Sequence, residues 1–143
     1  VDVIENLMSF YKLSVKMKNI EVQKNYYDTN VKVFADANMI RTSHRNIISN
    51  AIKYNKTNGK ITIELKKKGN QTCLIIEDTG IGMENLTLTK LFSYSESHQL
   101  EGTLGESSSG IGLFLTRDFL EKNDITVDVH SEIDKGTKFI LTI

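Results

Sequence analysis

The sequence predicts an α+β fold, a two-layer sandwich in which helices cover one face of a sheet. Residues 60–77 alternate apolar and polar side chains around Gly69-Asn70, which is the pattern of a β-hairpin. Residues 125–129 and 137–143 form two more strand-like runs on either side of Asp134-Lys135-Gly136. Residues 39–52 carry apolar side chains at helical spacing. Hairpins combined with amphipathic helices favour this fold class.

The composition fits one globular domain that covers residues 1–143. The chain is 39% hydrophobic and 25% charged, and its net charge of zero gives no basic field for nucleic acid. No run approaches the roughly 18–20 apolar residues of a membrane span, so we expect no direct membrane contact. Cys73 stands alone in an apolar run, which predicts a buried small side chain and no internal disulfide.

The first third of the chain is predicted to contain a helix, two short strands and the start of a second helix. Residues 2–18 have apolar side chains at helical spacing, and residues 20–27 and 31–34 resemble short strands around a polar turn. Asp36 stands where a helix cap is expected, directly before the periodic residues 39–52.

The region from residue 84 to residue 109 has a different composition. Apolar residues are sparse after Leu91-Phe92, and a loop of this length inside a compact domain is usually functional. Helical spacing resumes over residues 112–122.

Three polar side chains share one face near the end of the predicted helix over residues 39–52. Asn50 and Lys53 are three residues apart, and Asn50 and Tyr54 are four apart. An amide oxygen suits a hard cation, an ammonium group suits phosphate, and an aromatic ring suits a flat base. This combination indicates a site for a magnesium nucleotide.

Two glycine-containing loops lie further along the chain. The first follows a predicted strand and contains Asp78, Gly80 and Gly82; the second contains Gly110 and Gly112 and leads into a helix at Leu113. Asp78 is suited to accept a hydrogen bond from an amine, but Asp and Gly are also ordinary residues in a turn that ends a strand. The second loop is suited to direct backbone amides at an anion. Neither loop is a Walker A motif or a dinucleotide fingerprint. The Asp-Thr-Gly triplet at 78–80 also matches aspartic proteases, but that chemistry needs a second carboxylate.

The order of these motifs resembles the catalytic, ATP-binding domain of sensor histidine kinases, in the GHKL superfamily. The motifs are Asn-Ala-Ile-Lys-Tyr at 50–54, Asp-Thr-Gly-Ile-Gly-Met at 78–83, Leu-Phe at 91–92, Gly-Ile-Gly-Leu at 110–113 and Gly-Thr-Lys-Phe at 136–139. The resemblance covers nearly the whole chain. It implies an α/β sandwich with a mixed, mostly antiparallel sheet and about three helices.

The resemblance also implies a role for each matched residue. Asn50 would bind Mg²⁺, Lys53 would contact phosphate, and Tyr54 would pack at the nucleotide. Asp78 would accept from the adenine amine, in a pocket that Gly80, Gly82 and Thr137 help to form. The second loop, with Gly110, Gly112 and Leu113, would hold the phosphates, and residues 93–109 would close over ATP as a lid.

Asn46 separates two branches of this superfamily. The ATPase relatives have a glutamate at this position, four residues before the magnesium asparagine, and it activates water; an amide cannot take that proton. Asn46 therefore indicates the kinase branch, where its side chain would either belong to the magnesium site or contact the groups that bind the ion. Ser108 and Ser109 depart from the usual Gly and Thr of the second loop. His44, His98 and His130 do not lie in a phosphoacceptor motif.

The sequence therefore predicts a protein-histidine kinase domain that transfers the γ-phosphoryl group of ATP to a histidine. The acceptor histidine would lie on a separate dimerisation domain, and a response regulator would be the next partner. Without that acceptor domain, residues 1–143 are expected to bind ATP and Mg²⁺ without phosphorylating themselves. We expect a location in the cytoplasmic part of a membrane-anchored bacterial receptor. A pseudokinase that only binds nucleotide and a GHKL ATPase are the alternatives.

Overall fold

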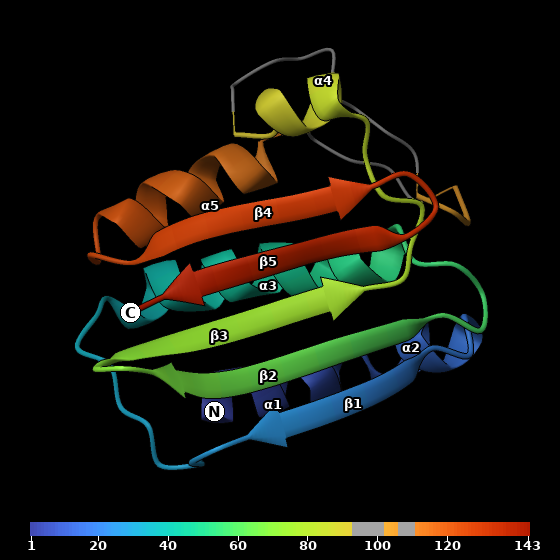
Figure 1. Cartoon of the computed structure of the whole chain (residues 1–143). Helices are drawn as coiled ribbons and strands as arrows, with labels where there is room; N and C mark the ends of the chain where they lie inside the picture. Colours follow the sequence, from blue (N-terminus) through green and yellow to red (C-terminus); the bar gives the residue numbers. More distant parts are fainter. Residues whose placement is uncertain (93–101, 106–110) are drawn as a thin grey trace.

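The computed structural model of the chain describes residues 1–92, 102–105 and 111–143 (Figure 1). Several sequence predictions lie outside the described residues. They concern Gly110, the serines at 107–109, His98 and most of the predicted lid.

The sheet has five strands in the order β1-β2-β3-β5-β4. They are β1 (Glu21–Tyr26), β2 (Lys60–Lys68), β3 (Gln71–Asp78), β4 (Thr126–Glu132) and β5 (Gly136–Thr142). Strand β1 pairs with β2 in parallel, and the other three pairings are antiparallel. The hairpins β2–β3 and β4–β5 are those that the sequence predicts. The α+β class and the mixed, mostly antiparallel sheet are therefore confirmed.

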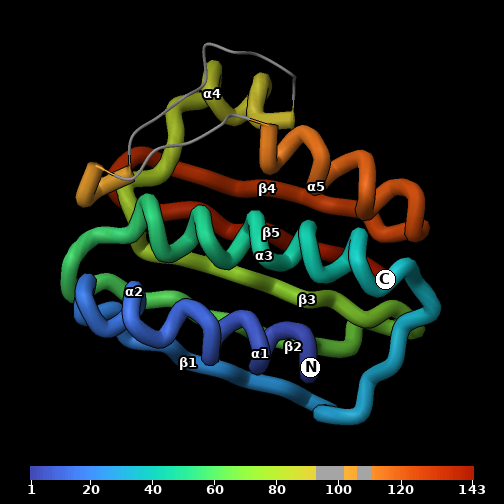
Figure 2. The backbone as a smooth tube through the Cα atoms, turned by 180° about the vertical axis from the view of Figure 1, so that it is seen from behind, coloured from blue at the N-terminus to red at the C-terminus, as the bar shows by residue number. Residues whose placement is uncertain are grey.

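The helices lie against one face of this sheet (Figures 1 and 2). They are α1 (Asp2–Phe10), α2 (Lys12–Met17), α3 (Ala37–Lys53), α4 (Asn85–Thr89) and α5 (Gly112–Glu121). The core between the two layers is mainly isoleucine and leucine, with Ile47, Ile48, Ile61 and Ile63 fully buried. No helix in the described part of the chain is long and apolar enough to cross a bilayer.

Helix α3 is the central helix of the fold, and it begins where the sequence predicts. The Asp36 carboxylate accepts hydrogen bonds from the backbone N–H groups of Asn38 and Met39, both at 2.9 Å. Such a cap stabilises a helix by about 1 kcal/mol. The apolar face of α3 is buried from Ile47 to Ile52, which fixes the rotation of the helix about its axis and therefore the direction of its polar residues.

Two sequence predictions about the first third of the chain are wrong. The single helix predicted over residues 2–18 is two helices, because Tyr11 leaves helical geometry at φ −87° and ψ 7°. Apolar periodicity does not detect a break of one residue. Residues 31–34 form no strand: Val31 and Val33 instead line a cavity beside α3, and Phe34 is exposed.

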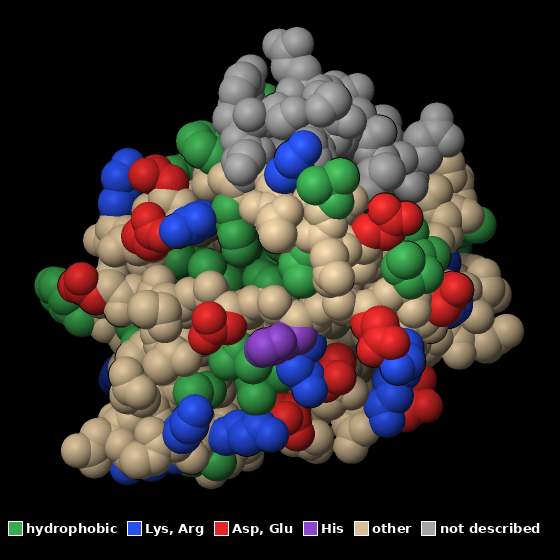
Figure 3. Space-filling view, turned by 45° about the horizontal axis from the view of Figure 1, so that its top comes forward, with side chains coloured by type: hydrophobic (Ala, Val, Ile, Leu, Met, Phe, Trp, Pro, Cys, Tyr) green, Lys and Arg blue, Asp and Glu red, His purple; other side chains and the backbone are tan. Residues whose placement is uncertain are grey.

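The other face of the sheet is not covered by helices, and it carries mixed charges (Figure 3). Lys66 pairs with Glu64 at 2.6 Å, and Lys138 pairs with Glu77 at 2.9 Å. Cys73 is buried and unbridged, as predicted.

Candidate nucleotide site

The C-terminal end of α3 brings together the three residues that the sequence places on one helix face. Asn50 and Lys53 lie in the last turn, and Tyr54 caps the helix with its N–H on the Asn50 carbonyl at 2.9 Å. The Lys53 ammonium nitrogen lies 5.0 Å from the centroid of the Tyr54 ring. All three side chains are half-buried, so they remain accessible to a ligand.

The first glycine loop packs directly on this helix end. A Cβ atom added to Gly80 would lie 2.3 Å from the Tyr54 carbonyl oxygen, and the Ile81 N–H donates to that same oxygen at 3.0 Å. Gly82 has φ +66°, and a Cβ there would lie 1.9 Å from the Glu132 carbonyl oxygen. The glycines therefore permit close approach to the protein's own backbone, which holds the loop between α3 and the β4–β5 turn.

Asp78 is a buried carboxylate with one oxygen held and the other available. Its Oδ1 accepts from the N–H groups of Gly80 at 2.8 Å and Thr137 at 3.3 Å. Its Oδ2 makes no hydrogen bond with any residue that the structure describes. Burial raises the pKa of this carboxyl to about 6, against the lowering effect of the two backbone N–H groups. At neutral pH, Asp78 therefore presents an ionised, oriented acceptor.

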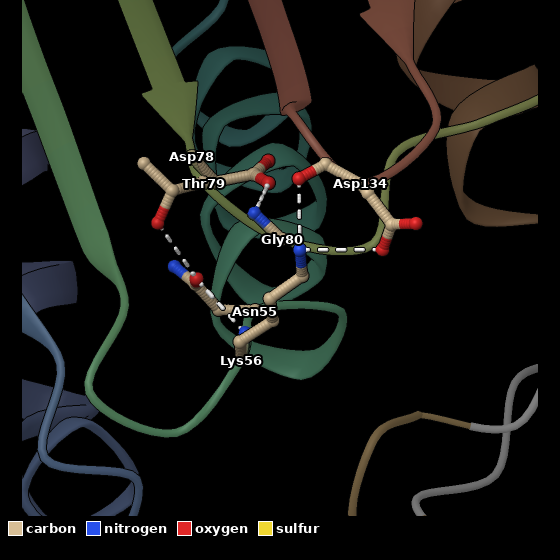
Figure 4. A network of polar contacts seen from close by, with 6 residues as sticks. All are labelled: Asn55, Lys56, Asp78, Thr79, Gly80 and Asp134. Atoms are coloured by element: carbon tan, nitrogen blue, oxygen red, sulfur yellow. Dashed lines mark hydrogen bonds and ion pairs between the residues drawn. The ribbon is translucent and has the colours of Figure 1, made fainter.

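A second polar network fixes the turn after α3 (Figure 4). The Asn55 side chain is fully buried, donates to the Lys60 carbonyl at 3.0 Å and accepts from the Lys56 N–H at 3.0 Å. The Thr79 hydroxyl donates to the Asn55 side-chain oxygen at 3.4 Å. The network connects the end of α3 to the end of β3, so Tyr54 and Asp78 are held in a fixed relation.

Lys18 ties the described part of the predicted lid to α3. Its side chain is almost fully buried, and its ammonium group donates to the carbonyls of Ile52 at 3.1 Å and Lys53 at 2.6 Å. It also donates to the Thr103 hydroxyl at 2.7 Å. The Thr103 hydroxyl in turn donates to the Asn55 carbonyl at 2.7 Å, and the Thr103 backbone N–H donates to the Lys53 carbonyl at 3.1 Å. The cation thus satisfies carbonyls at the negative end of the helix dipole.

The described part of the second glycine loop begins α5 beside Asn46. The Asn46 amide nitrogen donates to the Gly112 carbonyl at 2.9 Å and to the Thr116 hydroxyl at 3.1 Å. A Cβ on Gly112 would lie 3.4 Å from the Asn46 side chain. The amides of Gly112 and Leu113 belong to the first turn of α5, where helix N–H groups lack intrahelical partners. Asn46 therefore positions the start of this helix against α3.

Nothing in the sequence indicates the contacts of Lys18 and Asn55, and Thr103 is predicted only as part of the lid over residues 93–109. A lysine near the end of an amphipathic helix normally extends into solvent, so no sequence signal identifies Lys18 as buried. Asn55 lies in a polar run before Gly59, which predicts a turn and nothing more. Of the histidines, His130 is exposed, as expected for a strand residue on an uncovered face, and His44 is buried.

An α+β sandwich with an oriented buried carboxylate beside an Asn-Lys-Tyr helix end defines a nucleotide-binding class of domain. The chain belongs to the family of histidine kinase-, DNA gyrase B- and HSP90-like ATPases, whose model matches residues 35–143.

The similar proteins include a sensor protein and, among solved structures, histidine kinases. Sensor protein SrrB of Staphylococcus aureus is 33% identical over 98 residues, which cover 68% of this chain and 17% of SrrB. The chain therefore spans a small part of the curated relatives it matches. Among solved structures, the catalytic domain of histidine kinase ThkA superposes with a TM-score of 0.82 at 21% identity, over 99% of this chain and 91% of that one. The structure of ThkA in complex with the response regulator TrrA superposes with a TM-score of 0.76 at 19% identity, over 99% of this chain and 39% of that one. These likenesses confirm the fold.

Proposed function

We propose that residues 1–143 are the ATP-binding catalytic domain of a two-component sensor histidine kinase. The observation that supports this proposal most strongly is the Asp78 carboxylate, buried, oriented by two backbone N–H groups and left with one available oxygen. An acceptor in this position suits the 6-amino group of adenine. Thr137, paired with Asp78 across β3 and β5, would line the same pocket.

The remaining site residues would hold the triphosphate. Lys53 supplies a cation at the end of α3, and Tyr54 offers an aromatic face next to the first glycine loop. The first-turn amides of Gly112 and Leu113 suit phosphate oxygens because the helix dipole favours an anion there. Gly110, two residues before Gly112 in the glycine motif, would extend this set.

The donor set fits Mg²⁺ bound mainly by phosphate. The described residues contain no cluster of three carboxylate, histidine or cysteine side chains that would hold a metal without the nucleotide. Mg²⁺ characteristically keeps few protein ligands and is completed by substrate phosphates and water. Asn50, half-buried and one turn before Tyr54, would supply the protein oxygen. The bound ion would neutralise charge on the transferring phosphoryl group.

Asn50→Ala is expected to weaken Mg²⁺-ATP binding by about tenfold, the loss of one ligand, while leaving metal-free ATP binding unchanged. Titration of the protein with ATP, once in the presence of Mg²⁺ and once in the presence of EDTA, measures both affinities. Ser49→Ala is the matched control on the same helix turn. If Mg²⁺ strengthens ATP binding by Asn50→Ala as much as it does for the unmodified chain, the metal role is assigned to the wrong residue.

Asn46 favours phosphoryl transfer over hydrolysis. Its amide already donates to Gly112 and Thr116, and an amide cannot accept a proton from water as a carboxylate does. In the proposed reaction, a histidine ring nitrogen attacks the γ-phosphorus, an N–P bond forms, and the bond to the ADP oxygen breaks. Lys53 and the α5 amides would stabilise the charge on the moving group.

Mixing this chain with a separately produced histidine-bearing dimerisation domain and γ-labelled ATP tests the proposed reaction. Label on the histidine is the expected result. Nucleotide binding without transfer would favour the pseudokinase alternative, and free phosphate without an acceptor would favour an ATPase. Incubation of the chain alone is the control, and it is expected to give no self-phosphorylation.

The proposal also implies partners and a location. A response regulator would take the phosphoryl group from the acceptor histidine, in line with the ThkA–TrrA complex, which concerns that protein. Because ATP and response regulators are cytoplasmic, the domain would lie on the cytoplasmic side of a membrane-anchored receptor.

A further inference from the structure

An apolar cavity of about 240 Å³ lies beside α3, on the side of its N-terminal half. It is bordered by Ile4 of α1, Ile40 of α3, Leu65 of β2 and Leu74 of β3, and by the segment before α3. In the sheet, Leu65 pairs with Leu74, four residues along β3 from Asp78. His44 precedes Asn50 by six residues, about 9 Å along the helix axis. The cavity is therefore separate from the candidate nucleotide site.

The polar groups at this cavity are few, and one of them is already paired. Among the described lining residues, Tyr26 and His44 carry the polar side-chain atoms. The Tyr26 hydroxyl donates to Glu5 at 3.0 Å. The His44 imidazole is the remaining polar side chain among the lining residues.

His44 has a defined tautomer. Its Nδ1 lies 2.7 Å from the Ile40 carbonyl oxygen, which only accepts, so Nδ1 carries a proton. The residue is 7% exposed, and burial lowers the pKa of the imidazole, which favours the neutral ring. In that form Nε2 holds a lone pair, and it has no hydrogen-bond partner among the residues that the structure describes. Since the described residues contain no buried side-chain nitrogen or oxygen without a partner, the unpaired Nε2 keeps some accessible surface, and such an acceptor in the lining of an apolar cavity is suited to a ligand.

We propose that this cavity binds a small neutral aromatic molecule with one hydrogen-bond donor, of the indole or phenol class, through His44 Nε2. The cavity volume sets the size of the ligand: an apolar cavity of about 150 Å³ already holds benzene, so about 240 Å³ has room for a somewhat larger aromatic molecule. None of the lining side chains is charged, and a charge that acts on His44 comes from the Val1 α-amino group, so a ligand that must bury an ion against these side chains is disfavoured. The single acceptor gives the orientation.

Indole and benzofuran test the proposal, because they have the same shape but only indole has an N–H. We expect indole to bind the 143-residue chain with sub-millimolar affinity and benzofuran about tenfold more weakly. Indole should shift the NMR signals of the Ile40 and Leu74 amides and of the His44 imidazole nitrogen. His44→Leu should abolish the difference between the two ligands, and Ala35→Leu, which reduces the cavity, should weaken both.

A far-UV circular dichroism spectrum and a cooperative thermal unfolding transition like those of the unmodified chain would show that each variant is folded. Three results would overturn the proposal: no indole binding up to its solubility limit, equal affinity for the two ligands in the unmodified chain, or shifts centred on Asp78 and Tyr54 instead of the cavity. The first and second need no variant, so a variant that fails to fold leaves the test intact. A failure of the proposed kinase function would not affect these outcomes.

Discussion

Asp78→Asn is expected to weaken ATP binding by about 100-fold or more and to make the domain prefer inosine triphosphate. The backbone N–H groups of Gly80 and Thr137 fix an oxygen at the Oδ1 position, so the new amide must place its NH₂ group at the Oδ2 position. That group then faces the adenine amine, donor against donor. A purine with a carbonyl oxygen at C6 would accept from it. Competition between the two nucleotides for a fluorescent analogue measures the change.

A stability measurement distinguishes the expected loss of ATP affinity in Asp78→Asn from a loss of the fold. The folded pKa of Asp78, about 6, lies above the ordinary value of 3.8, so the ionised form is less favourable in the folded chain than in the unfolded one. Stability is therefore lost as the pH rises from about 4 through 6, and the loss is about 2–3 kcal/mol. Asp78→Asn removes this dependence, and we expect it to be at least as stable as the unmodified chain at pH 7.5.

Asp134→Asn is the matched control for Asp78→Asn. Asp134 lies in the neighbouring turn and pairs with Lys56 at 3.3 Å, but its side chain is exposed. The same chemical change there should leave both nucleotide affinity and preference unchanged. An Asp78→Asn domain that still prefers ATP over inosine triphosphate would contradict the adenine assignment.

Lys18→Met is expected to lower the free energy of unfolding by about 2–4 kcal/mol. Methionine keeps the length of the side chain but leaves the Ile52 and Lys53 carbonyls without their charged donor at the end of α3. Denaturant unfolding followed by circular dichroism measures the loss. Lys16→Met is the control, because Lys16 lies in the last turn of α2, two residues before the C-cap residue Lys18, and is exposed. Equal stability of the two variants would mean that Lys18 does not stabilise the site.

Thr103→Val separates the stability of the fold from the attachment of the segment at residues 102–105. Thr103 is exposed, and its hydroxyl bridges the Lys18 ammonium and the Asn55 carbonyl. We expect less than about 1 kcal/mol of lost stability but a several-fold weaker affinity for ATP, with Thr103→Ser restoring it. If Thr103→Val changes neither the stability nor the ATP affinity, the contact between Lys18 and Thr103 has no effect on nucleotide binding. Lys18 would then act only on the carbonyl groups at the end of α3.

The sequence predicts well the parts of the site that depend on local spacing. Asn50, Lys53 and Tyr54 share a helix face because the interval of three or four residues requires it, and the Asp36 cap gives the start of that helix. The two hairpins follow from alternation around short turns. The order of the motifs then gives the family, which the family model confirms.

The sequence does not predict contacts between distant segments. The pairing of β1 with β2 is parallel and crosses α3, and no periodicity shows it. Lys18 contacts residues 34, 35 and 85 positions away, and its burial depends on those partners. The close approach of Gly82 to Glu132 likewise joins two turns that only the folded sheet brings together. These long-range contacts hold the site in place, whereas local spacing supplies its chemistry.

Amide chemical shifts test most directly whether ATP binds with its adenine at Asp78. Addition of a non-hydrolysable ATP analogue with Mg²⁺ to the ¹⁵N-labelled chain should move the Gly80 and Thr137 amides strongly, because both donate to the Asp78 carboxylate. The Lys53 and Leu113 amides should move as well. Saturating analogue that leaves Gly80 and Thr137 unshifted would contradict the account.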